Sequence, residues 1–308
     1  MPSNPRVLSL LPSATEVLCA IGASELLVGR SHECDFPPSI LDRPTLTRAR
    51  ALGTTSAEID ASVRTLLQSG AESLYAIDEE MIRALRPDVI LTQSLCEVCS
   101  IDLKSVERLV ESLPHKPQII SLNPMSVFDV LDDILRVGEA VDRHALAEAA
   151  MVKLRDEYWS AIDFVNPYVP GPEVLFLEWM DPIFVGGHWT PQLIETAGGR
   201  HALNLAGAKS RQVAPEDVLE SMPSRIIIAP CGLSIDRIRE ELDVLTKTRW
   251  WPLLPAVLDS NPQNIVLVDG NQMFNRPGPR LVDAFRFLVG WLNNRQELIP
   301  KNFPFEVL

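Results

Sequence analysis

The residues of this chain whose types and spacing could do chemistry are its five cysteines. Cys96 and Cys99 have the C-x₂-C spacing that lets one loop present two thiolates to a single ion. Cys34 and Cys231 lie in two other loops, each following a predicted strand. Four thiolates suit zinc or an iron–sulfur cluster, whereas calcium and magnesium prefer oxygen ligands. These four cysteines therefore predict a metal site, and the alternative is that they are small, weakly polar loop residues.

Other cysteines and histidines suggest different roles. Cys19 lies inside a predicted helix, so we expect a buried structural thiol there. Cys231 with His188 could supply the nucleophile and base of a hydrolase. Nothing near Cys231 resembles a nucleophile elbow, and we expect no enzyme. His32 and His188 are further nitrogen donors, and a thiolate or an imidazole could also ligate the metal of a bound tetrapyrrole.

The elements that must position these residues alternate between strands and helices. In the first half we expect strands at 6–11, 26–31, 88–92 and 118–122, and helices at 13–22, 56–69, 78–85 and 102–113. A capping box, Ser13 to Glu16, should open the first of these helices. In the second half we expect strands at 173–178, 183–185, 225–229 and 265–268, and helices at 191–197, 215–222, 236–247 and 280–293. Strands separated by helices predict an α/β fold with mostly parallel sheets.

The two halves resemble each other. The segment that begins at Glu80 aligns with the one that begins at Glu216, at a constant offset of 136 residues. Each segment gives an acid-started short helix, a proline, a buried strand and a cysteine-bearing loop. This repeat predicts two similar α/β lobes.

One long helix is expected between the halves. Apolar residues recur every four positions at Leu146, Ala150, Leu154, Tyr158 and Ile162, with a second row at Ala145, Ala149, Val152, Trp159 and Val165. A helix over 142–168 would span about 35 Å, enough to join two domains. We therefore expect an N-terminal lobe at 1–125, a helical segment with the connecting helix at 126–170, and a C-terminal lobe at 171–308. The alternative is a surface helix of one large domain.

Two lobes joined in this way would face each other across a ligand cleft. Ligands of open α/β sheets bind beyond the carboxyl ends of the strands. The loops at those ends are 32–38, 94–99, 179–189, 230–231 and 271–279.

Composition limits the partners. The chain has 308 residues and a net charge of −13, which disfavours nucleic acid and anionic membranes because both would be repelled. No run approaches the roughly 18 apolar residues of a membrane span. The N-terminus lacks a signal-peptide pattern, so the sequence as written predicts the cytoplasm and reduced thiols. A mature exported protein without its leader is the alternative.

Several segments carry a resemblance to a known family: RVLSLLPSATEVLCAIG, ALRPDVILTQ, the central helix and the glycine-closed helix of the second half. They resemble the helical-backbone family of substrate-binding proteins, which serve ABC importers of vitamin B12, iron-siderophores and haem. Within it, HECDFPP, LCEVC, PCG and FNRPGPRL are similar to the branch labelled cobalamin-binding. The resemblance covers almost the whole chain. It implies two lobes, a rigid connecting helix and a ligand held between the lobes.

The resemblance also implies roles for particular residues. The ligand-binding residues it points to are His32, Trp179, Trp189, Phe274, Asn275 and Arg276. The tryptophans and Phe274 would supply apolar walls, and Arg276 would contact polar amides or carboxylates. His32 falls where the family has an aromatic residue. Glu80 and Glu216 match the paired glutamates that contact the importer permease.

The sequence therefore predicts a non-enzymatic binding protein for a cobalamin-like or other metal-containing ligand. The alternative is a cytosolic metal or iron–sulfur protein that uses the cleft cysteines on the same fold.

Overall fold

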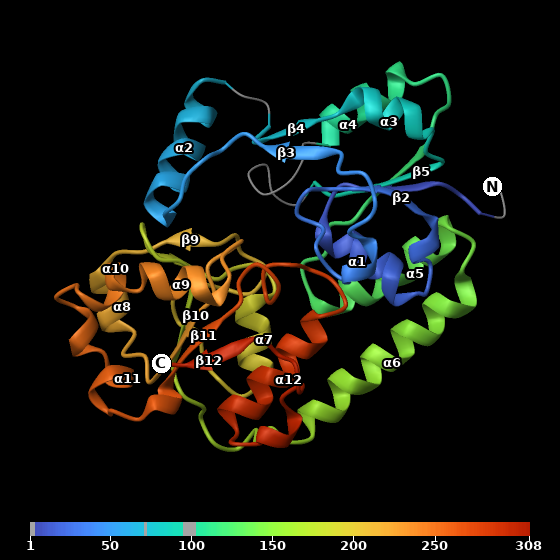
Figure 1. The fold of residues 1–308 in the computed structure, drawn as a ribbon. Coiled ribbons are helices and arrows are strands. Elements are labelled where there is room, and N and C mark those ends of the chain that lie inside the picture. The colour runs from blue at the N-terminus through green and yellow to red at the C-terminus, as the bar shows by residue number, and fades with distance from the viewer. Residues whose placement is uncertain (1–3, 71–72, 95–102) are drawn as a thin grey trace. The chain divides into compact units, whose positions relative to one another are not determined.

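A computed structural model describes residues 4–70, 73–94 and 103–308, and in it the chain forms two compact units. The first unit comprises Met1–Thr54, Glu58–Pro124 and Phe128–Arg155. The second comprises Thr55–Ala57, Met125–Val127 and Asp156–Leu308. Figure 1 traces the chain through its elements.

The first unit is built on a four-stranded parallel sheet in the order β2-β1-β5-β6. Its strands are β1 (Val7–Ser9), β2 (Leu27–Arg30), β5 (Val89–Thr92) and β6 (Gln118–Ser121). Helices α1 (Pro12–Ala20), α3 (Glu79–Leu85) and α4 (Leu103–Ser112) lie between these strands in the chain, and α5 (Val127–Ala140) follows β6. Every residue of β1 and β5 is buried, as expected for central strands covered on both faces. The predicted parallel sheet is confirmed.

Two features of the first unit differ from the sequence-based expectation. An antiparallel pair of short strands, β3 (Thr47–Ala49) and β4 (Tyr75–Ile77), was not predicted, and helix α2 (Ser56–Gln68) lies between them in the chain. The predicted capping box at Ser13 is wrong. Helix α1 starts one residue earlier with Pro12 in its first turn, and no side chain caps it. Proline suits this position because the first-turn N–H groups lack helical partners anyway.

The second unit contains a six-stranded mixed sheet in the order β12-β11-β10-β7-β8-β9. Its parallel centre is β7 (Val174–Trp179), β10 (Arg225–Ile228) and β11 (Ile265–Val268). The antiparallel strands are β8 (Phe184–Val185), β9 (Arg211–Gln212) and β12 (Phe305–Val307). The sheet is thus parallel at its centre and antiparallel toward both edges.

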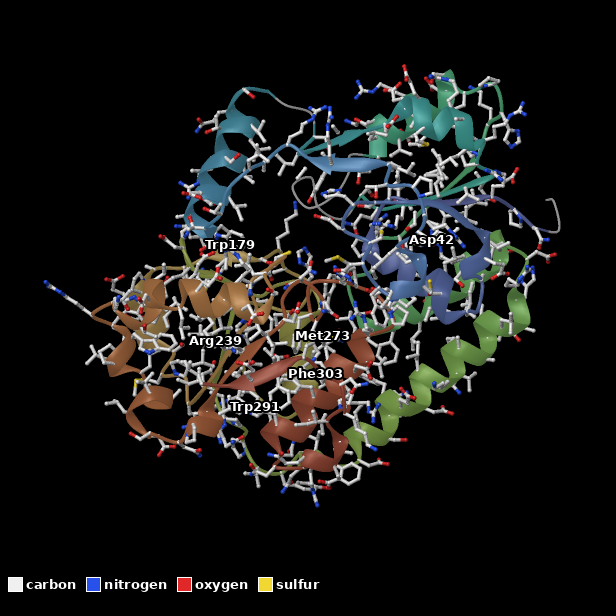
Figure 2. All side chains as sticks on the ribbon, viewed as in Figure 1. Asp42, Trp179, Arg239, Met273, Trp291 and Phe303 are labelled. Atoms are coloured by element: carbon white, nitrogen blue, oxygen red, sulfur yellow. The ribbon has the colours of Figure 1, made fainter. Side chains whose placement is uncertain are left out.

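The helices of the second unit are α7 (Thr190–Thr196), α8 (Pro215–Glu220), α9 (Ile235–Glu241), α10 (Asp243–Thr246), α11 (Pro255–Leu258) and α12 (Leu281–Leu292). The helix predicted over 236–247 is divided at Leu242 into α9 and α10. Aromatic rings pack around α12, where the ring centroids of Phe287 and Phe303 lie 4.4 Å apart in a stacked arrangement. Phe303 and Trp291 of this aromatic group are labelled in Figure 2.

The predicted long helix is α6 (His144–Ile162), with 19 residues. Its buried residues are Ala147, Tyr158 and Ala161, whereas Leu146, Val152 and Trp159 of the predicted stripes are exposed. The second predicted row was therefore wrong, because the buried face is rotated relative to it. The division between the two units falls inside this helix, between Arg155 and Asp156.

The sequence repeat corresponds to a repeat of structure. Strands β5 and β10 lie at the predicted offset of 136 residues, and each pairs in parallel with the first strand of its own unit. The residue before each strand forms the same bond. The backbone N–H of Asp88 donates to the carbonyl of Arg6 at 2.8 Å, and that of Ser224 donates to Glu173 at 3.0 Å. The predicted similarity of the two halves is thereby confirmed.

Candidate functional site

His32 lies two residues after the end of β2, at the carboxyl edge of the first sheet. Its neighbour Ser31 continues the parallel pairing, with its backbone N–H donating to the carbonyl of Ser9 at 2.8 Å. Thr47, the first residue of β3, contacts His32 twice. The backbone N–H of His32 donates to Thr47 Oγ1 at 3.0 Å, and His32 Nδ1 lies 2.7 Å from the same oxygen. The unpredicted strand β3 is therefore what orients the imidazole.

Tyr75 and Glu33 complete the surroundings of His32. The rings of His32 and Tyr75 are tilted by 52° with centroids 5.5 Å apart. The Tyr75 hydroxyl donates to Glu33 Oε1 at 3.1 Å. Burial lowers the pKa of His32, and the charge of Arg30 lowers it further while Glu33 opposes both. We therefore expect a neutral imidazole at pH 7. Sequence reasoning missed Tyr75, whose place beside His32 depends on the pairing of β3 with β4.

Trp179 ends β7 at the carboxyl edge of the second sheet and is half-buried. Its position can be found in Figure 2. The indole Nε1 is buried and has no hydrogen-bond partner in the described part of the chain. A buried N–H without an acceptor is unfavourable by about 1–3 kcal/mol, so such a group calls for an explanation. The preceding residue, Glu178, accepts a bond from the Ser210 hydroxyl at 2.8 Å.

The loop after β11 is held by side-chain amides. Asn275 Nδ2 donates to the carbonyl of Ala229 at 3.0 Å and to that of Gly270 at 2.8 Å, which joins the loops after β10 and β11. Arg276 is 6% exposed, and its Nη2 donates to Asn271 Oδ1 at 3.1 Å. Asn275 and Arg276 therefore make structural hydrogen bonds at the strand ends.

Trp189 and Phe274 were predicted to form apolar walls, but both side chains are buried. Trp189 is 5% exposed and Phe274 is 1% exposed. The Trp189 indole N–H donates to the carbonyl of Phe274 at 2.7 Å, and the Phe274 ring meets Phe176 edge-on with centroids 5.0 Å apart. Both side chains belong to the core of the second unit. In this structure they are buried and do not form exposed apolar walls.

The structure describes only two of the four cysteines of the predicted metal site, Cys34 and Cys231. Cys96 and Cys99 lie outside the described residues. Cys34 does not lie on a loop surface as expected; it is fully buried in the apolar core, and its sulfur accepts a bond from the Thr15 hydroxyl at 3.0 Å. Cys231 is partly buried. Within residues 4–70, 73–94 and 103–308, no group of three or more His, Cys, Asp or Glu side chains could hold a metal ion.

The remaining predicted residues are surface or loop residues. Glu80 in α3 and Glu216 in α8 are both exposed in the first turn of their helices, so their equivalence in the repeat is preserved. His188 has a positive φ of 53°, and its ring lies 5.5 Å from that of Trp189. Burial lowers the pKa of His188, and the charge of Lys209 lowers it further.

Two α/β units with parallel central strands, sharing one long helix, have the architecture of the helical-backbone class of substrate-binding proteins. No family model matches the sequence. The chain is 26% identical over 291 residues to the vitamin B12-binding protein of Pectobacterium carotovorum subsp. carotovorum (strain PC1), which covers 91% of this chain and 85% of that protein.

Solved structures agree on the fold. The periplasmic vitamin B12 binding protein BtuF of Vibrio cholerae matches with a TM-score of 0.69 and 19% identity, covering 95% of this chain and 98% of that one. A periplasmic heme binding protein from Pseudomonas aeruginosa matches with a TM-score of 0.70 and 18% identity, covering 94% and 93%. These matches confirm the predicted resemblance to helical-backbone substrate-binding proteins of the vitamin B12 type. Within the described residues, no helix has the length and apolar character to cross a membrane.

Proposed function

We propose that this chain is a non-enzymatic binding protein for a cobalamin-like corrinoid. The observation that carries the proposal is the match to a vitamin B12-binding protein over 91% of the chain. The site residues support it. Trp179 offers a half-buried ring for stacking, and its unpartnered Nε1 can donate to a carbonyl of the corrin side chains. His32 and Tyr75 offer two further partly exposed rings.

Titration with cyanocobalamin, followed by calorimetry, tests this proposal. The wild-type protein should bind, and Trp179→Ala should weaken binding about tenfold or more because stacking area and a hydrogen bond are lost. Trp159→Ala is the matched control, since Trp159 lies on α6 and is 51% exposed. Absence of heat at tens of micromolar wild-type protein would reject the corrinoid.

We propose further that the protein works outside the cytoplasmic membrane and delivers its ligand to an ABC permease. The matched structures are periplasmic binding proteins, and Glu80 and Glu216 are exposed at equivalent positions of the two units. Lysine at both positions should abolish co-purification with the permease of the source organism, because attraction to basic residues becomes repulsion. Lysine at the exposed neighbours Glu79 and Glu220 gives the matched control. Equal loss in both double variants would remove the specific role of Glu80 and Glu216.

A further inference from the structure

The hydrogen bonds around Thr47 engage one of the two ring nitrogens of His32, Nδ1. Thr47 Oγ1 donates its single proton to Ser31 Oγ at 3.1 Å. It accepts from the backbone N–H of His32 at 3.0 Å and lies 2.7 Å from Nδ1. When the Thr47 proton is on the bond to Ser31, the His32 tautomer that satisfies this contact carries its proton on Nδ1. Thr47 is 6% exposed, so water competes little for these bonds.

The other ring nitrogen is left with a lone pair. His32 Nε2 has no hydrogen-bond partner among the described residues, and the side chain is partly exposed. A histidine that donates from Nδ1 to a fixed acceptor and keeps Nε2 open has the arrangement of a metal ligand with its supporting bond. The Tyr75 ring, 5.5 Å away, limits rotation of the imidazole, and the hydroxyl of Tyr75 is itself held by Glu33.

A single imidazole does not hold a free ion. Structural metal sites need about four protein ligands, and in the described part of the chain no group of three or more candidate side chains comes together. Among the described residues, a metal that meets His32 therefore finds no complete set of protein ligands. A tetrapyrrole supplies most of the ligands itself, because its four ring nitrogens leave only axial positions open. His32 lies at the carboxyl end of β2, where α/β sheets bind their ligands.

We propose that His32 Nε2 is an axial ligand to the metal of the bound tetrapyrrole. This inference rests on the proposed function and adds the atom that contacts the metal. With aquacobalamin the step is a ligand exchange. The cobalt–oxygen bond to water breaks, the Nε2 lone pair forms a cobalt–nitrogen bond, and water leaves to solvent. The oxidation state of cobalt is unchanged, and the Nδ1 proton stays on the bond to Thr47.

Comparison of two corrinoids separates binding from ligation. Aquacobalamin has an exchangeable axial water, whereas cyanocobalamin has a firmly held cyanide. Binding is measured by equilibrium dialysis, and ligation by the shift of the near-ultraviolet corrin band toward that of imidazole-cobalamin. Wild-type protein should bind both and shift only aquacobalamin. His32→Ala should lose the aquacobalamin shift and weaken the binding of aquacobalamin more than that of cyanocobalamin, because only aquacobalamin loses a bond to the metal. His115→Ala, at an exposed histidine of the same unit, should retain the shift.

Thr47 is a positioning residue, and its variants test the supporting bond. Thr47→Val should weaken the ligation of aquacobalamin about 10–100-fold and leave cyanocobalamin binding intact, because the Nδ1 acceptor is lost. Thr47→Ser keeps the hydroxyl and should restore ligation. If Thr47→Val weakens the binding of both corrinoids alike, the role of Thr47 is merely structural, and this part of the inference is overturned.

The outcomes distinguish the inference from the function on which it rests. Binding of both corrinoids without a shift in the wild type overturns His32 ligation and leaves the proposed function standing. Binding of neither corrinoid removes the proposed function. A parallel titration with haemin tests a porphyrin as the ligand. If the protein binds no corrinoid but gives an imidazole-type shift of the haem Soret band, and His32→Ala removes this shift, the axial role of His32 is supported. The ligand is then a porphyrin and not a corrinoid.

Discussion

Arg86 and Met222 have the same left-handed backbone conformation, with φ angles of +48° and +50°, and they lie 136 positions apart. Each follows a short helix and precedes a proline, after which the chain enters the central parallel strand of its unit. Left-handed backbone is unfavourable for residues with a Cβ by about 1–2 kcal/mol. The two units therefore share a strained turn as well as a topology.

Glycine at this turn should stabilise the protein. Met222 is 62% exposed, so its replacement removes little packing. Met222→Gly should raise the free energy of unfolding by about 0.5–1 kcal/mol, since relief of strain exceeds the entropy gained by the unfolded chain. Met222→Ala keeps the Cβ and should give no gain. Urea denaturation of both variants checks this, and equal effects of glycine and alanine would contradict it.

The part of the fold that sequence could predict is the part determined by local patterns. Strand β11 is observed at the predicted residues because four consecutive apolar residues, Ile265 to Val268, are bounded by Asn264 and Asp269. The parallel order of the sheets followed from alternation of strands and helices. Even the repeat was visible, because its short helix, proline and strand all occur within a dozen residues.

The parts that sequence could not predict depend on contacts between distant segments. Strand β3 has no apolar alternation, and its partner β4 begins 28 residues later, so neither the pair nor the contact of Tyr75 with His32 was visible. Phe274 lies in a polar, glycine- and proline-rich loop, which suggested a surface ring. Its positive φ of 64° accompanies a ring packed into the core instead.

We therefore expect substitution of Phe274 to lower the stability of the protein. Phe274→Ala should lower the free energy of unfolding by about 3–5 kcal/mol, because the ring is fully buried against Phe176. Phe164→Ala should lower it by about 1 kcal/mol, since Phe164 is 40% exposed and contacts the Arg295 guanidinium. Guanidinium denaturation measures both. Similar losses in the two variants would mean that Phe274 is not a core residue.

The close approach of α5 and α6 in the first unit should depend on Gly138. A Cβ added there would clash with the Cβ of Ala147. At an exposed helix position without such a neighbour, alanine is more favourable than glycine by about 1 kcal/mol. A loss of stability in Gly138→Ala would therefore indicate the clash. Gly138→Ala should destabilise the protein by about 1–3 kcal/mol.

The reciprocal change is the control for this contact. Gly138→Ala combined with Ala147→Gly should recover part of the lost stability, because the second change makes room for the first. Thermal or urea unfolding of the two single variants and the double variant gives the coupling between the sites. A single Gly138→Ala variant more stable than wild type would show that the helices do not approach closely at this point.

Asp133 on α5 should make stability depend on pH. It is 5% exposed, and its Oδ1 accepts from Arg136 Nη1 at 2.6 Å, whereas Oδ2 has no partner among the described residues. Burial raises the pKa of Asp133 to about 6, against the opposing effect of Arg136, and Asp129 and Asp132 raise it further. The folded state thus binds a proton at a higher pH than the unfolded state, whose pKa is near 3.8.

The sign of the effect follows from this difference. As pH falls through about 6 toward 3.8, the folded state takes up a proton that the unfolded state does not, so this group then adds stability; above pH 6 its buried charge is unfavourable. Asp133→Asn keeps the hydrogen bond without the charge. It should raise the free energy of unfolding more at pH 8 than at pH 5, by about 1.4 kcal/mol. Asp163→Asn, at an exposed position, should show no such difference. Urea denaturation at the two pH values decides, and an Asp133→Asn gain that is equal at both would mean that the carboxyl is charged in the folded protein throughout this range.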